Sequence, residues 1–195
     1  MKIIRALALL TFLLALAASC AAQEPQASPT PVEFQTRLES LMSETGAVIV
    51  EGYTRVGSVA GSRGTAYVTA WEVTDATAGH KELGVEVEIA DPAARPEADD
   101  DRAFIDYDEI TPLLRGIDYM TRLDNRVTKL SRFDAQYQTR GGLVLVTFST
   151  PNGQATAIST EGGRRARFVL RPAGLAELRN LIESAKQALD APPSQ

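Results

Sequence analysis

Apolar and polar residues alternate along much of the chain, and a period of two predicts β-strands. The clearest case is residues 83–90, where every second residue from Leu83 to Ile89 is leucine, valine or isoleucine. One face of such a strand is buried and the other is wet, as in an antiparallel sheet covered on one side. Seven to eight strands in two blocks are predicted, at residues 47–56, 65–73, 83–90, 104–105, 133–140, 143–149, 154–160 and 166–170.

Two longer stretches follow the helical period instead. The first begins either at Asp108 as the capping residue or at Thr111, with Pro112 then in the first helical position. Pro172 opens the second, and a shorter helix is predicted at residues 32–43. The apolar stripes of the two long helices are Ile110, Leu113, Leu114, Ile117, Met120 and Leu123, and Leu175, Leu178, Leu181, Ile182, Ala185 and Leu189.

Strands and helices arranged in blocks predict an α+β fold, with two long amphipathic helices packed on one face of an antiparallel β-sheet. Gly116 inside the first long helix predicts close packing of that helix against a strand. Four apolar positions of this helix recur in the last one at a constant offset of 65 residues. An internal duplication would produce this pattern, and so would any two amphipathic helices that follow strands.

The N-terminal residues predict export. Lys2 and Arg5 precede an apolar run at 6–18 and a patch of small residues, which is the plan of a signal peptide ending near residue 22. The run of 13 residues is shorter than the roughly 20 that span a bilayer. We expect a periplasmic, membrane-anchored or secreted protein. The remaining divisions are a Pro/Ser-rich linker at 23–31, a single α+β domain at 32–191 and a disordered tail at 192–195.

Cys20, the only cysteine, leaves two interpretations of the cleavage site open. In the first, residues 16–20 resemble a bacterial lipobox and Cys20 becomes lipidated. In the second, an ordinary signal peptidase cuts after Ala21 or Ala22. In either case the folded part has no disulfide.

Charge and composition disfavour several classes of function. Removal of Lys2 and Arg5 takes the formal net charge from −5 to −7, which disfavours binding to nucleic acid. His80 is the only histidine, so a zinc, copper or iron site built from imidazole and thiolate ligands is not expected. No cofactor is predicted, and the only membrane contact expected is an N-terminal lipid anchor, under the interpretation in which Cys20 is lipidated.

No catalytic residues are predicted. A Ser-His-Asp arrangement would need His80, and no serine lies in a nucleophile-elbow pattern. Asp106 and Asp108 point to the same side of an extended stretch, as a glycosidase pair would, but so do many surface acids. We therefore expect a protein that is not an enzyme.

One candidate interaction surface combines a basic patch with an acidic counterpart. The basic patch is Arg140, Arg164, Arg165 and Arg167, and its counterpart is Asp106 and Asp108. The alternative is that these charged side chains only keep the edges of the hairpins in contact with water and discourage strand-to-strand aggregation. The leading hypothesis is a non-catalytic extracytoplasmic domain that binds an envelope component or a partner protein. The alternatives are a carrier of a small apolar ligand between sheet and helices, and a carboxylate-dependent hydrolase.

Overall fold

The computed structural model describes residues 36–90, 101–161 and 168–192. The chain divides into two compact units, Met1–Glu33 and Phe34–Gln195, and every described residue belongs to the second. The predicted signal peptide, the linker at 23–31, Cys20 and residues 193–195 lie outside the described residues. Within the described part, no helix is both long and apolar enough to cross a membrane.

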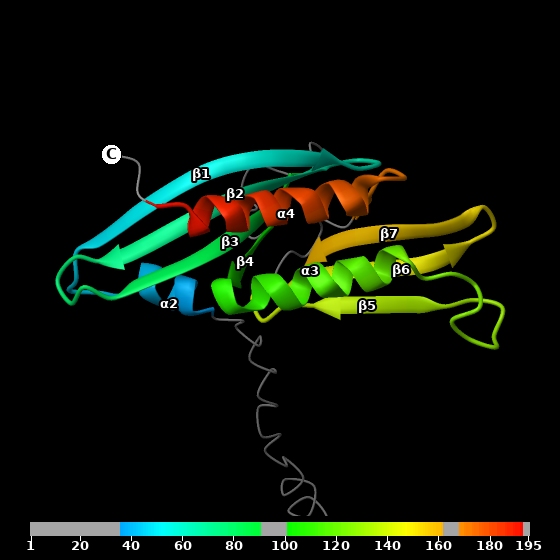
Figure 1. Cartoon of the computed structure of the whole chain (residues 1–195), viewed down its shortest axis with the longest axis horizontal. Coiled ribbons are helices and arrows are strands. Elements are labelled where there is room, and N and C mark those ends of the chain that lie inside the picture. The colour runs from blue at the N-terminus through cyan, green and yellow to red at the C-terminus, as the bar shows by residue number, and fades with distance from the viewer. Residues whose placement is uncertain (1–35, 91–100, 162–167, 193–195) are drawn as a thin grey trace, which may run out of the picture. The chain divides into compact units, whose positions relative to one another are not determined.

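The fold is α+β, as predicted, but its strands form two antiparallel sheets of four strands each instead of one (Figure 1). The first has the order β1-β2-β3-β4, with strands β1 (Ile49–Ala60), β2 (Thr65–Asp75), β3 (Lys81–Ala90) and β4 (Arg102–Asp106). The second has the order β5-β6-β7-β8, with strands β5 (Asp134–Gln138), β6 (Leu143–Thr150), β7 (Gly153–Thr160) and β8 (Phe168–Val169). Helix α3 (Tyr107–Thr121) follows β4 directly, so β4 and β5 cannot pair as a hairpin.

The helices within the described residues are α2 (Arg37–Met42), α3 and α4 (Gly174–Asp190). A capping box at the start of α2 joins the Thr36 hydroxyl to the Glu39 backbone N–H and the Glu39 side chain to the Thr36 backbone N–H. Both predicted starts of α3 are wrong, because its N-cap is Asp106 and Pro112 lies inside the helix. The chain turns from strand to helix with no intervening loop, so the first turn begins earlier than either predicted cap.

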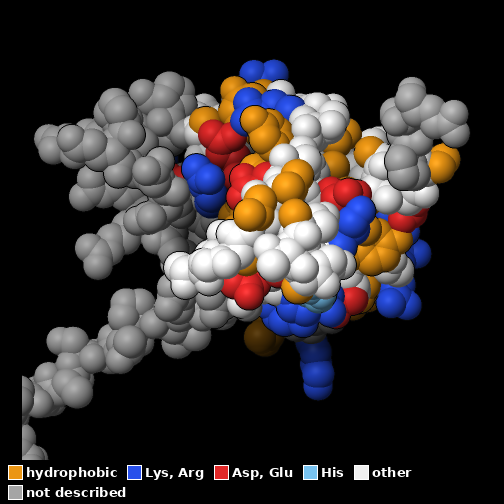
Figure 2. Space-filling view, turned by 90° about the vertical axis from the view of Figure 1, so that its left-hand side faces the viewer, with side chains coloured by type: hydrophobic (Ala, Val, Ile, Leu, Met, Phe, Trp, Pro, Cys, Tyr) orange, Lys and Arg blue, Asp and Glu red, His pale blue; other side chains and the backbone are white. Residues whose placement is uncertain are grey.

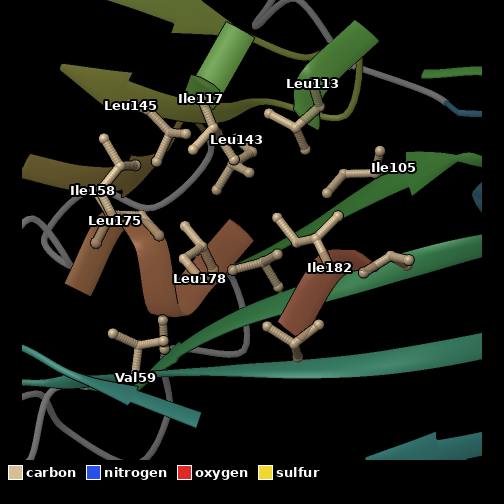
Figure 3. Close-up of a cluster of buried hydrophobic side chains, with 14 of the residues drawn as sticks. Val59, Ile105, Leu113, Ile117, Leu143, Leu145, Ile158, Leu175, Leu178 and Ile182 are labelled. Atoms are coloured by element: carbon tan, nitrogen blue, oxygen red, sulfur yellow. The ribbon is translucent and has the colours of Figure 1, made fainter. Parts of the chain in front are cut away.

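Helices α3 and α4 fill one apolar core that both sheets share. Helix α4 packs on β1, β2 and β3, although it follows the second sheet in the chain, and α3 contacts β3, β4 and β5. Figure 3 shows the side chains of both helices pointing into this core, where they meet strands of both sheets; labelled members are Val59, Ile105, Leu113, Ile117, Leu143, Leu145, Ile158, Leu175, Leu178 and Ile182. The core therefore holds the two sheets in one unit.

Helix α2 covers the other face of the first sheet, so the prediction of helices on one face is incomplete. Leu38 and Leu41 of α2 pack with Val73 and Phe104 in a second, smaller cluster. Along β2, Val73 points away from the face that carries Val68 and the main core. Helix α2 thus covers part of the face of the first sheet that the alternation of apolar and polar residues predicts to be exposed to solvent.

Strand β1 is longer than predicted, because the glycines after Val56 do not begin a loop. The register with β2 shifts between Arg55 and Gly57, and the strand continues from there to Ala60. A Cβ on Gly57 would lie 2.7 Å from a methyl carbon of Leu181 in α4. Gly57 therefore lets the helix approach the strand closely.

The two halves of the domain share one element order, four antiparallel strands and then a helix. The four apolar positions that recur at the 65-residue offset are buried in both helices; they are Ile110, Leu113, Ile117 and Met120 in α3, and Leu175, Leu178, Ile182 and Ala185 in α4. Strand β6, apolar on both faces in the sequence, lies inside its sheet as predicted.

Gly116 packs closely against a strand, as predicted, because a Cβ there would overlap the ring of Tyr137 on β5. Burial, and then the negative charge of Glu109, raise the pKa of Tyr137 above its ordinary value of about 10. The stabilisation from the neutral phenol is complete below that ordinary value and is lost as pH rises through the folded-state pKa. The free energy of unfolding should therefore fall above about pH 10, and urea unfolding of Tyr137→Phe should show a smaller fall.

Candidate functional site

The predicted acidic residues lie where β4 runs into α3. Asp106 is only 1% exposed, and its carboxylate accepts hydrogen bonds from the backbone N–H groups of Arg37 at 3.1 Å and Leu38 at 3.2 Å. These two residues begin helix α2. Asp106 therefore satisfies the start of a helix that lies nearly 70 residues earlier in the chain, and its side chain makes no capping bond to α3.

Two arginines bind these acids from opposite directions. Asp106 Oδ2 lies 3.6 Å from Arg37 Nε and 3.4 Å from an Arg140 terminal nitrogen. Asp108 Oδ1 accepts from Arg37 at 2.8 Å and from Arg140 at 2.6 Å. Glu109 accepts the backbone N–H of Arg140 at 3.1 Å and raises the pKa of its guanidinium. We call Arg37, Asp106, Asp108, Glu109 and Arg140 the junction network.

The junction network brings together three of the six residues predicted as an interaction surface. Asp106, Asp108 and Arg140 bind one another and Arg37, while Arg164, Arg165 and Arg167 lie outside the described residues. Sequence reasoning missed Arg37, and no local signal could have revealed it, because its partners are far away in the chain. The network joins α2, α3 and the β5–β6 turn, which is a structural role.

A metal centre is not formed by the residues that the structure describes, since no three His, Cys, Asp or Glu side chains among them gather closely enough to hold an ion. His80 instead lies 3.1 Å from Glu82 at the start of β3. Figure 2 shows the end of the molecule where β1 begins, with acidic, basic and hydrophobic side chains mixed over its surface. This end offers no broad area of one charge.

Exposed large hydrophobic side chains in the described part fall into two groups. The first is Val48, Val50 and Tyr53, at the start of edge strand β1, and the second is Tyr119, Val127 and Leu130, at the end of α3 and in the segment that leads to β5. Single exposed apolar residues are normal on a protein surface, whereas groups of them mark binding surfaces. These two places are the strongest candidates for contact with a partner.

The second group lies among cations. We define the connector surface as Tyr119, Arg122, Arg126, Val127, Lys129, Leu130 and Arg132; the segment that carries most of it is the loop between α3 and β5, at the right of Figure 1. Leu130 is 74% exposed. Surface hollows of about 410 Å³ and 540 Å³ flank the loop; the first includes Tyr119 and Val127 in its lining, and the second includes Arg132.

The cations of the connector surface are only partly neutralised. Arg126 donates to Asp124 at 2.7 Å, and this hydrogen bond lowers the pKa of the Asp124 carboxyl. Arg122 donates to a backbone carbonyl oxygen, that of Asp118, at 3.0 Å. Within the described residues, Lys129 and Arg132 have no acidic partner. A partner with an acidic rim could therefore pair with both of them.

Comparisons of the chain with known protein families, with curated proteins and with solved structures found no match.

Proposed function

We propose that the protein is an exported, non-catalytic domain that binds a partner protein of the cell envelope through the connector surface. The observation that carries the proposal is the exposure of Tyr119, Val127 and Leu130 among three arginines and one lysine, on a chain whose net charge is −5. Apolar residues in the middle of a patch supply binding energy, and unpaired cations at its edge steer an acidic partner.

The composition of the patch favours a protein over a lipid or nucleic-acid surface. Tyrosine and arginine are the residue types enriched in the energetic centres of protein interfaces. Asp118 and Asp124 lie among the cations, Asp118 binding Arg179 and Asp124 binding Arg126. A membrane or a nucleic acid would favour an uninterrupted basic surface.

Contacts elsewhere in the domain support this function over its two alternatives. A carrier would need a large space between the helices and the sheets. The core in that layer is filled by residues such as Leu113, Ile117 and Leu178 (Figure 3), and a hollow of about 360 Å³ lies where β7 and β8 meet the start of α4. A carboxylate-dependent hydrolase would need acids free to exchange protons with a substrate. Asp106 and Asp108 are each bound by two arginines, so both carboxylates are already held in ion pairs within the domain.

Two further parts of the proposal concern location and origin. Export, with or without lipidation of Cys20, would place the domain in the periplasm, on a membrane or outside the cell. The repeated order of four strands and a helix supports an internal duplication. Related chains whose halves align at the same 65-residue offset would strengthen that origin, and a different offset in them would argue against it.

A photo-crosslinking amino acid placed at Leu130 in the living cell tests the binding site. We expect a discrete protein adduct from position 130 and none from Thr111, an exposed position near the other end of α3. Lys129→Glu in the same chain should reduce the adduct several-fold, because it reverses a charge that has no partner among the described residues. The measurement is the fraction of the protein shifted on a denaturing gel.

Arg63→Glu is the matched control, since it makes the same charge reversal at an exposed arginine in the β1–β2 loop. Both reversals should change the free energy of unfolding by less than about 0.5 kcal/mol. Equal adduct yields from Lys129→Glu and the unaltered chain would rule out the connector surface as the binding site.

A further inference from the structure

Strand β1 offers an open edge for pairing with another strand. It is the outermost strand of the first sheet, so one side of its backbone is not paired in that sheet. All six residues from Val50 to Arg55 are exposed, because α4 approaches β1 at Gly57 and beyond. Natural proteins usually protect such an edge with charges, prolines or a covering segment.

The charged residues on this edge are complementary to the same residues of a second copy of the chain. Glu51 and Arg55 point to the same face of the sheet as Tyr53, which lies midway between them. In an antiparallel pair of two β1 strands centred on Tyr53, each Glu51 stands opposite the Arg55 of the other copy. The same register places Val50 opposite Val56 and one Tyr53 ring opposite the other.

The present partners of these residues leave room for this pairing. Glu51 has no ion pair within the described part of the chain. Arg55 binds Glu88 at 2.6 Å and lies over the Tyr67 ring, and its guanidinium has five N–H donors, enough to bind a second carboxylate. Tyr53 is 67% exposed and stacks on Trp71, with ring centroids 4.7 Å apart. That stacking fixes the tyrosine ring at the centre of the edge.

We propose that the protein forms a two-fold symmetric homodimer in which two β1 strands pair antiparallel from Val50 to Val56, centred on Tyr53. The two first sheets then join into one sheet of eight strands. A two-fold interface uses the same patch on both copies, so the single pair of Glu51 with Arg55 occurs twice. This dimer is independent of the connector surface and of the partner proposed for it.

Sedimentation-velocity centrifugation of the full chain over a range of concentrations tests the dimer. Glu51→Arg should weaken self-association about tenfold or more, because two attractive pairs become two repulsive ones. Arg55→Glu should do the same. An equimolar mixture of the two variants should recover the dimer. The Glu51→Arg chain carries arginine at both positions 51 and 55 and the Arg55→Glu chain carries glutamate at both, so both pairs across a mixed dimer are attractive.

Glu44→Arg makes the same charge change at an exposed residue just after α2, and it should leave self-association unchanged. A chain that stays monomeric at every concentration overturns the proposal. So does a dimer that is indifferent to Glu51→Arg, or a mixture of the two variants that associates no better than either alone. Every variant keeps the same N-terminal region, so the differences among them arise from the changed residue.

Discussion

Replacing Asp106 by alanine should lower the free energy of unfolding by about 3 kcal/mol, whereas Asp108→Ala should lower it by less than about 1 kcal/mol. The two carboxylates are two residues apart and bind the same two arginines. They differ in burial, because the side chain of Asp106 is 1% exposed and that of Asp108 is 55% exposed. Burial therefore decides the size of the effect.

The physical reason is the pair of backbone N–H groups that Asp106 accepts. A hydrogen bond to a charged acceptor contributes about 1.5–3 kcal/mol, and a buried donor left unpaired costs its full desolvation. Leu38 N–H is buried, so water cannot replace the lost carboxylate there. The arginines are half-exposed and regain water when Asp108 is removed, which is why the outer carboxylate contributes little.

Urea unfolding of the two alanine variants and of Asp106→Asn measures the difference. The asparagine variant keeps one acceptor oxygen, so its loss of stability should fall between those of the two alanine variants. Thermal unfolding should show Asp106→Ala melting about 6–12 °C below the unaltered chain, for a domain of this size. Equal stabilities for Asp106→Ala and Asp108→Ala would contradict the capping role assigned to Asp106.

This prediction also separates structure from catalysis at the junction network. If Asp106 were a general acid or base, its removal would abolish turnover without unfolding the chain. A large loss of stability, with α2 separating from the first sheet, would instead identify Asp106 as a residue that joins α2 to that sheet. Asp106 would then have a structural role, and the hydrolase alternative would lose it as a catalytic acid or base.

Local periodicity is sufficient to find most of the elements. The alternation at 83–90 corresponds to β3, and the stripe from Ile110 to Met120 is the buried side of α3. Each of these signals comes from residues that are neighbours in the chain and share a face. The two sheets could not be predicted in this way, because an alternating strand does not reveal its neighbour across the sheet.

The junction network and the length of strand β1 could not be predicted from local sequence patterns for the same reason. The sequence marks Asp106 as a charged residue, but its role depends on Arg37, which reaches it only through the packing of α2 on the first sheet. The sequence also predicts that β1 ends before Gly57, since glycine favours turns; the close approach of Leu181 explains why glycine is there instead. Contacts between distant segments determine both cases.

Gly141→Ala should destabilise the domain by about 3 kcal/mol, although alanine usually costs less conformational entropy than glycine. A Cβ on Gly141 would overlap the carbonyl oxygen of Phe104 in β4, and would lie 2.9 Å from both the carbonyl carbon of Phe104 and the Cγ2 of Thr36. The obstacle is backbone in a buried strand, so no side-chain rotation relieves it. The β5–β6 turn would have to move away from β4, which would loosen the contact of Arg140 with the junction network.

Gly52→Ala is the matched control, because it makes the same change in β1 with only one contact, 3.7 Å to the Glu72 carbonyl oxygen. That distance is ordinary van der Waals contact, so this variant should be as stable as the unaltered chain or more stable by about 0.5–1 kcal/mol. Urea unfolding compares the two, with near-ultraviolet circular dichroism as a check on native packing. Equal stabilities for Gly141→Ala and Gly52→Ala would contradict the close packing of the β5–β6 turn against β4. They would also contradict the geometry that brings Arg140 to Asp106.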